Sequence, residues 1–210
     1  MSRPLRRGAA LALLLLAGCA AMRPAPEMRT YRLAYPPPDP SAATPLPVTV
    51  RVMPFGIAGA YDSLAFIYRA SAYDVGTDPY NRWIANPASM IADLVARDLA
   101  ASKTVRAVLQ AASAVPYDYE LSGHVETFEE RDAGSCSAML RVRVALAHVP
   151  PRGPRAVVMQ DIFSAEPPCT EASAPGYAEA MSRAVQQVSH EIRAAVLRTI
   201  AADLSQRLAE

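Results

Sequence analysis

The sequence predicts an α+β fold: an antiparallel or mixed β-sheet with two α-helices packed on one face, in a single domain. Two observations predict this class. Segments whose apolar residues alternate in steps of two, as in half-buried strands, stand before and after one segment with helical spacing. A second helical segment, much longer than the first, closes the chain.

The predicted strands show this alternation or are rich in branched and aromatic residues, and turn-forming residues separate them. In residues 48–53, for example, Val48, Val50 and Val52 occupy every second position. The strands are expected at residues 30–34, 48–53, 64–69, around Tyr73, and at 105–109, 119–129, 140–148 and 156–163.

Asn86 and Pro87 predict the start of the first helix, because asparagine caps helices and proline is favoured at the first helical position. Apolar residues follow at helical spacing: Met90, Ile91, Leu94, Val95 and Leu99.

Pro175 and Gly176 open the closing helix. Its apolar stripe consists of Met181, Val185, Val188, Ile192, Val196, Ile200, Leu204 and Leu208. This helix is longer than one small sheet can cover. We therefore expect its tail, from about Ile200, to overhang the sheet and meet a neighbour, which favours a ring-like homo-oligomer.

Residues 1–18 predict a lipoprotein signal peptide. Arg3, Arg6 and Arg7 form a positive region, and residues 9–17 form an apolar run. That run has roughly half the length needed to span a bilayer, which argues against a retained transmembrane helix. The sequence Leu-Ala-Gly-Cys at 16–19 resembles a bacterial lipoprotein processing site. The alternative is an ordinary signal peptide in which the cysteine is coincidental.

Cleavage before Cys19, with acylation of its sulfur and its new amine, would attach two or three lipid chains, enough for stable anchoring. The next residue is Ala20 rather than aspartate, which by resemblance to sorting rules in enteric bacteria predicts the periplasmic face of the outer membrane. Residues 19–29 then form a lipidated tether. Its reach is about 30 Å at about 3.1 Å per residue, so the domain of residues 30–210 stays close to its membrane.

The charge balance argues against a nucleic-acid-binding protein. The full chain has 21 basic and 20 acidic residues, and the loss of three arginines with the signal peptide leaves 18 and 20. No cluster of lysine or arginine compensates for this slightly negative balance, whereas nucleic-acid-binding domains usually carry a strongly positive face.

The two remaining cysteines predict a disulfide. With the first cysteine assigned to lipid, Cys136 and Cys169 remain as a pair in an oxidising compartment. The hairpin predicted for residues 140–163 turns between Arg152 and Gly153, so paired residue numbers sum to 305. The two cysteine numbers have the same sum, which brings their Cα atoms near the spacing of a disulfide. Two prolines just before the second cysteine should end the strand, so we predict proximity rather than ladder pairing. The alternative is two free buried thiols.

The sequence does not support an enzyme, a metal site or a bound cofactor. His124, His148 and His190 stand apart, without a cysteine or second histidine at metal-ligand spacing. Nucleophile elbows, glycine-rich phosphate loops and zinc-protease motifs are also missing from the sequence. We therefore assign no catalytic residue.

An aromatic cluster between residues 61 and 83 has two interpretations. Its members are Tyr61, Phe66, Tyr68, Tyr73, Tyr80 and Trp83. In the first interpretation they pack the sheet against the first helix. In the second, some of them form an interface with a partner protein or a lipid headgroup, because tyrosine, tryptophan and arginine dominate interaction hot spots. The candidate interface residues are Tyr61, Tyr68, Arg69, Tyr80, Arg82 and Trp83.

Several segments, in order, resemble the ABC-type transport auxiliary lipoproteins. They are the processing site at Cys19, Tyr31-Arg32-Leu33, Tyr61-Asp62-Ser63 through Ile67-Tyr68-Arg69, Tyr80-Asn81-Arg82-Trp83, the helix after Asn86-Pro87, the 123–128 strand and the alanine-rich closing helix. The resemblance covers nearly all of residues 30–205 and is most specific over 61–99. One departure is Ile84-Ala85-Asn86-Pro87, where the family pattern has an acidic residue before the proline.

The resemblance implies an accessory, non-enzymatic docking subunit of a system that moves lipid or other hydrophobic cargo between two membranes. Its expected partners are a periplasmic MCE-domain protein and an associated ABC transporter. The alternative from another class is a structural or assembly lipoprotein of a different cell-envelope complex, without a role in lipid transport.

Overall fold

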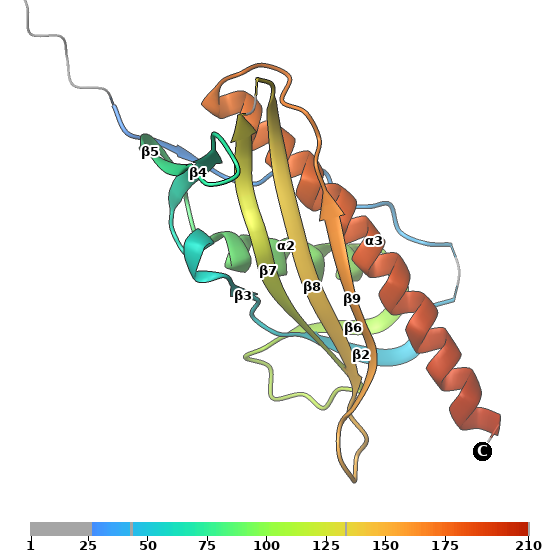
Figure 1. Ribbon diagram of the computed structural model, residues 1–210. Coiled ribbons are helices and arrows are strands. Elements are labelled where there is room, and N and C mark those ends of the chain that lie inside the picture. Colours follow the sequence, from blue (N-terminus) through green and yellow to red (C-terminus); the bar gives the residue numbers. More distant parts are fainter. Residues whose placement is uncertain (1–26, 43, 133, 210) are drawn as a thin grey trace, which may run out of the picture.

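The computed structural model describes residues 27–42, 44–132 and 134–209, so the predicted signal peptide, Cys19 and most of the predicted tether lie outside the described residues. Within these ranges nine strands form one mixed sheet (Figure 1). The strands are β1 (Arg29–Tyr31), β2 (Leu46–Val52), β3 (Gly56–Ile57), β4 (Ala65–Arg69), β5 (Val75–Trp83), β6 (Val105–Gln110), β7 (Tyr119–Asp132), β8 (Cys136–His148) and β9 (Ala156–Ala165). The helices are the short 3-10 helix η2 (Gly59–Tyr61), α2 (Pro87–Ala101) and α3 (Ala174–Ala209).

The three longest strands, β7, β8 and β9, form an antiparallel meander. Residue numbers paired between β8 and β9 sum to 305 from Leu140 and Ala165 to Leu146 and Met159, which is the register expected from the sequence. A bulge after Leu146 shifts the pairing by one residue near the turn. The alternation of apolar residues therefore sets which face of this hairpin is buried.

Three short strands lie in line along the other edge of β7, and each pairs with it in parallel. β2 pairs with the beginning of β7, β3 with its middle and β4 with its end. β6 extends the sheet beyond β2, whereas β5 and then β1 extend it beyond β4. The sheet thus divides into two arms on this side, and the β4–β5–β1 arm carries the predicted interface residues.

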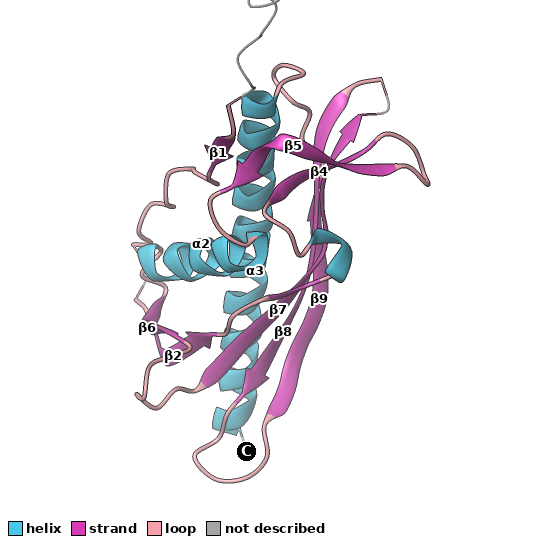
Figure 2. Cartoon of the chain, turned by 90° about the vertical axis from the view of Figure 1, so that its left-hand side faces the viewer, coloured by secondary structure: helices cyan, strands magenta, loops and turns pink. Residues whose placement is uncertain are grey.

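Both helices cover the same face of the meander, as the sequence predicts (Figure 2). α2 begins as expected: the Asn86 side chain accepts a hydrogen bond from the backbone N–H of Ala88 at 3.0 Å, and Pro87 occupies the first turn. The predicted stripe of α3 packs on β8 and β9 up to Ile200, and Met181, Val185, Ile192 and Val196 in it are fully buried, whereas Leu208 is exposed. Each such side chain contributes about 1.5–3 kcal/mol by leaving water.

The tail of α3 extends past the sheet, as expected from its length (Figure 1). Ile200 is fully buried, while the residues after it are exposed or half-buried. The overhang begins past Asp203, whose carboxylate accepts a hydrogen bond from the Tyr119 hydroxyl at 2.6 Å. Contact of this tail with a neighbouring copy stays a prediction. In the described part of the chain, neither helix combines the length and apolar content required to cross a bilayer.

The prediction of a strand around Tyr73 is wrong. Tyr73 lies in the turn between β4 and β5 and is 99% exposed, and the Ser71 hydroxyl accepts a hydrogen bond from the Asp74 N–H at 3.2 Å in that turn. β5 itself starts at Val75 and contains Pro79. A proline in a sequence argues against a strand, because it has no N–H to donate to the neighbouring strand. Proline is tolerated here because it sits in a bulge.

Candidate interaction surface

Trp83 belongs to the core rather than to the surface. Its side chain is 1% exposed, and its ring centroid lies 4.5 Å from that of Phe66 and 5.2 Å from that of Phe128. Tyr177 of α3 completes this group at 5.8 Å. The packing interpretation therefore describes Phe66 and Trp83, but the helix whose ring they contact is α3, and not the first helix as expected from sequence.

Glu129 on β7 is fully buried and holds Tyr61 and Arg69 in place. Its carboxylate accepts hydrogen bonds from Arg69 Nε at 2.6 Å and Nη2 at 3.0 Å, and from the Tyr61 hydroxyl at 2.7 Å. Burial acts to raise the pKa of Glu129, but the hydrogen bonds from Arg69 and Tyr61 and the charges of Arg69 and Arg131 lower it on balance. A carboxylate that stays ionised in this position fixes the arm to β7. We call Tyr61, Arg69, Trp83 and Glu129 the inner group.

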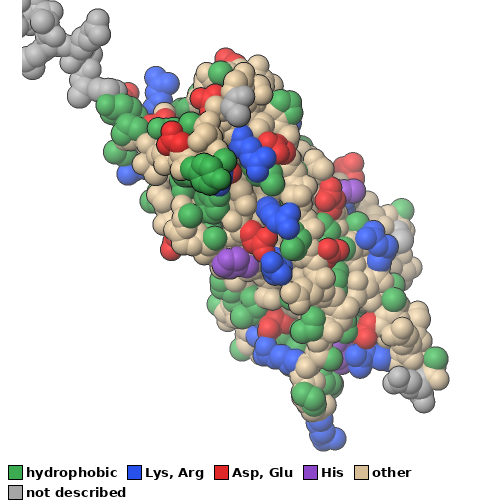
Figure 3. All heavy atoms as spheres, viewed as in Figure 1, with side chains coloured by type: hydrophobic (Ala, Val, Ile, Leu, Met, Phe, Trp, Pro, Cys, Tyr) green, Lys and Arg blue, Asp and Glu red, His purple; other side chains and the backbone are tan. Residues whose placement is uncertain are grey.

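The other predicted interface residues are accessible. Tyr68 and Tyr80 are exposed, as is Arg82. Tyr80 and Arg82 line a shallow groove with Met28 and Leu64, two further exposed apolar residues. In Figure 3, hydrophobic side chains gather at the corner of the molecule where the described chain begins. Tyr68, Tyr80 and Arg82 are therefore the predicted interface residues that a partner protein or a lipid headgroup could contact.

Cys136 and Cys169 are joined by a disulfide, with their Cα atoms 5.3 Å apart. β9 ends before the two prolines, as expected, but the pairing continues through them. The Ala138 N–H donates to the Pro167 carbonyl at 3.0 Å, Ser137 bridges to Pro168, and the Cys169 N–H donates to the Cys136 carbonyl at 2.9 Å. The expectation of proximity without ladder pairing is thus too cautious. The prolines interrupt the strand without ending its register.

Glu130 lies beside this disulfide, with its Oε1 3.2 Å from Cys136 Sγ. Burial, helped by the charges of Asp132 and Asp78, raises the pKa of Glu130. In the described part of the chain, Glu130, Cys136 and Cys169 form one cluster of residue types that can bind a metal ion. Because both sulfurs are bonded to each other, neither is the thiolate that a zinc site requires.

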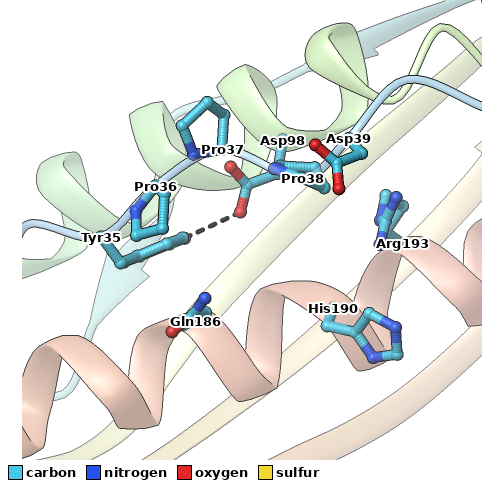
Figure 4. A pocket seen from close by; sticks show the side chains of 9 residues that line it. All are labelled: Tyr35, Pro36, Pro37, Pro38, Asp39, Asp98, Gln186, His190 and Arg193. Carbon is cyan, nitrogen blue, oxygen red and sulfur yellow. Dashed lines mark hydrogen bonds between the residues drawn. The ribbon is translucent and has the colours of Figure 1, made fainter.

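A small polar pocket lies between α2, α3 and the proline-rich loop after β1, which contributes residues 35–39 (Figure 4). Asp98 at its base is buried and accepts hydrogen bonds from the Tyr35 hydroxyl at 2.8 Å and the Ser189 hydroxyl at 2.7 Å. Arg97 also donates to Asp98, at 2.7 Å, and to the Tyr35 carbonyl, at 3.0 Å. Burial and the Asp98 charge raise the pKa of the Tyr35 hydroxyl, so it remains a proton donor in this link. The network ties the loop after β1 to both helices.

Glu129 and Asp98 are the residues that sequence reasoning missed. Alternation from Leu121 through Val125 would place residue 129 on the apolar face of β7. A bulge between Val125 and Thr127 reverses the alternation, so Phe128 enters the core and Glu129 faces the arm instead. Sequence carries no clear signal for that bulge.

Comparisons with known proteins place this geometry among solved folds. A crystal structure of a Xanthomonas campestris protein, assigned to the family DUF330, superposes with a TM-score of 0.75 at 23% identity, covering 84% of this chain and 99% of that one. An uncharacterised protein gives 0.61 at 15% identity, covering 81% and 99%. A hypothetical protein from Chlamydia trachomatis gives 0.50 at 15% identity, covering 75% and 99%. These similarities concern the fold.

No curated protein matches the chain. The family model described as "ABC-type transport auxiliary lipoprotein component" matches residues 31–193, which run from the end of β1 through the rest of the arm, α2 and the meander to the middle of α3. The chain therefore belongs to the ABC-type transport auxiliary lipoprotein family.

Proposed function

We propose that this protein is a periplasmic lipoprotein, anchored to the outer membrane through Cys19, that acts as the docking subunit of an MCE-type, ABC-linked lipid transport system. The observation that carries the proposal is the family match over residues 31–193. The processing site at residues 16–19 supplies the anchor, and a short tether keeps the folded domain near its membrane.

A docking role fits the chemistry of the described residues. The inner group and the Asp98 network pair their charged groups internally, and together with the disulfide they rigidify the domain. A rigid domain held within about 30 Å of a membrane can receive the end of a conduit that spans the periplasm. A shuttle would need a longer tether than this one.

Co-purification tests the proposal. We expect the MCE-domain protein of the same organism, detected by its own antibody, to co-purify with the tagged full chain from detergent-solubilised membranes. Recovery of a different envelope complex, without MCE or ABC subunits, would support the assembly role instead. A gene neighbourhood with MCE and ABC subunits beside this gene would favour the transport role independently.

The anchor is tested separately with Cys19→Ser. We expect the wild-type chain to incorporate a labelled palmitate analogue and to fractionate with the outer membrane. The variant should lose the label and appear in the soluble periplasmic fraction. Label retained in the variant, or wild-type protein found in the inner membrane, would contradict the proposed anchor or its address.

A further inference from the structure

An exposed apolar corner lies at the beginning of the described chain. Met28 is 53% exposed, Leu64 43% and Tyr80 46%, and all three border the same groove. They come from the residue before β1, the residue before β4 and the middle of β5. We call these three residues, with Arg29 and Arg82, the outer corner.

A bulge in β5 holds the outer corner in its exposed position. Ala65 pairs with Arg82, but Ile67 pairs with Thr77, so β5 carries extra residues between these two points. The Asp78 carboxylate organises them by accepting hydrogen bonds from the Tyr80 N–H at 2.7 Å and the Asn81 N–H at 3.0 Å. Burial acts to raise the pKa of Asp78, but these hydrogen bonds and one from the Asn81 side chain lower it overall. The bulge is therefore built into the strand, and Tyr80 projects from it.

The arginines of the outer corner differ from those on the strands of the meander. Arg141 and Arg143 both pair with Glu126. In residues 27–42, 44–132 and 134–209, by contrast, no acidic side chain pairs with Arg29 or Arg82. Two cations without acidic partners, beside three exposed apolar side chains, form a surface that matches anionic headgroups next to acyl chains.

The position of the outer corner limits what can cover it. Only seven residues, 20–26, separate Cys19 from the first described residue, Glu27, which immediately precedes Met28. Even fully extended, that segment spans at most about 30 Å. The turn between β8 and β9 and the end of α3 lie at the opposite end of the molecule (Figure 1). A lipid anchor would therefore bring the outer corner, and not the far end, to the bilayer.

We propose that the outer corner rests on the lipid surface, with Tyr80, Met28 and Leu64 in the interfacial zone and Arg29 and Arg82 on anionic headgroups. Tyrosine side chains are enriched at this depth because the ring is apolar and the hydroxyl is polar. This inference rests on the proposed anchor at Cys19. It orients the domain, so that the β8–β9 turn and the tail of α3 face the periplasm and are the surfaces offered to a partner protein.

Depth-dependent fluorescence quenching tests the orientation. Lipidated full-length protein is reconstituted in phosphatidylethanolamine and phosphatidylglycerol vesicles with brominated acyl chains, as Tyr80→Trp or as its control Val157→Trp. Val157 is 66% exposed on β9, near the turn at the far end, and the native Trp83 is buried and common to both variants. We expect quenching of the indole introduced by Tyr80→Trp and none of that introduced by Val157→Trp.

A second measurement removes the anchor from the test. In the full mature chain carrying Cys19→Ser, we expect Leu64→Glu to lower sedimentation with anionic vesicles roughly tenfold, because a charge replaces an apolar contact at the interface. Circular dichroism and the urea midpoint show whether the variant is folded.

The outcomes separate the two proposals. Protein that floats with the vesicles but shows no quenching for Tyr80→Trp overturns the lipid contact and leaves the anchor intact. Protein that does not float overturns the anchor, and the orientation with it. If the indole introduced by Tyr80→Trp is shielded only when the MCE-domain protein is added, the corner is a protein-docking surface and the lipid contact is wrong.

Discussion

The inner group and the outer corner both contain tyrosine and arginine, and most of their residues come from the same stretch, residues 61–83. Tyr61 and Trp83 are buried and Arg69 is half-buried, held by Glu129 and aromatic rings, whereas Tyr80 and Arg82 are exposed a few residues away. The difference teaches that tyrosine, tryptophan and arginine do not identify an interface by themselves. What separates the two groups is whether a neighbouring strand supplies a buried partner.

Trp83→Ala should give the largest effect. We expect a loss of about 3–5 kcal/mol in the free energy of unfolding, because a large fully buried side chain leaves a cavity against Phe66 and Phe128. Urea denaturation at neutral pH measures it. A loss under about 1 kcal/mol would mean that the site collapses around the smaller side chain and that the inner group is not a packed core.

The disulfide next to the inner group should rank second. Replacing Cys136 and Cys169 together by serine should cost about 2–4 kcal/mol, because the cross-link closes a 33-residue separation in the unfolded chain. The same urea titration measures it. Thiol titration of the unfolded, unreduced mature protein provides the check: two reactive groups would contradict the disulfide, and none is expected.

Glu129→Gln should rank third and should also change the response to pH. We expect a loss of about 1–3 kcal/mol at pH 7, since the amide cannot make the charged bidentate contact with Arg69. The pKa of Glu129 is lowered in the folded state, so its stabilisation is complete above about pH 4.3 and disappears as the pH falls through the folded value. Wild type should therefore lose more stability than the variant between pH 6 and pH 3. Parallel pH profiles would contradict the ionised pair.

Tyr80→Ala should have the smallest effect on stability, within about 0.5 kcal/mol, because its ring lies on the surface. The same substitution should nevertheless reduce vesicle binding of the chain that carries Cys19→Ser. Tyr73→Ala is a matched control, since it removes a fully exposed tyrosine from the turn of the same hairpin. Equal losses for Tyr80→Ala and Trp83→Ala in urea would remove the distinction between the two groups.

The sequence by itself determined the elements whose physical cause is local. Asn86 and Pro87 start α2, the apolar stripe after Pro175 makes α3, and alternation in residues 140–163 sets the hairpin register that aligns the two cysteines. These signals need only the periodicity of one element and its caps. They also sufficed for the fold class and, through the family resemblance, for the family itself.

Tertiary structure alone decided which polar and aromatic residues are buried. The bulge in β7 turns Glu129 toward β4, the bulge in β5 turns Tyr80 away from the core, and parallel pairing of β4 with β7 brings Arg69 to the carboxylate. The contact between Arg69 and Glu129 joins residues 60 positions apart in sequence, and both bulges depend on pairing with another strand. One extra residue in a strand reverses every face that follows it. Local patterns do not contain that information, because the partner strand sets the position of the bulge.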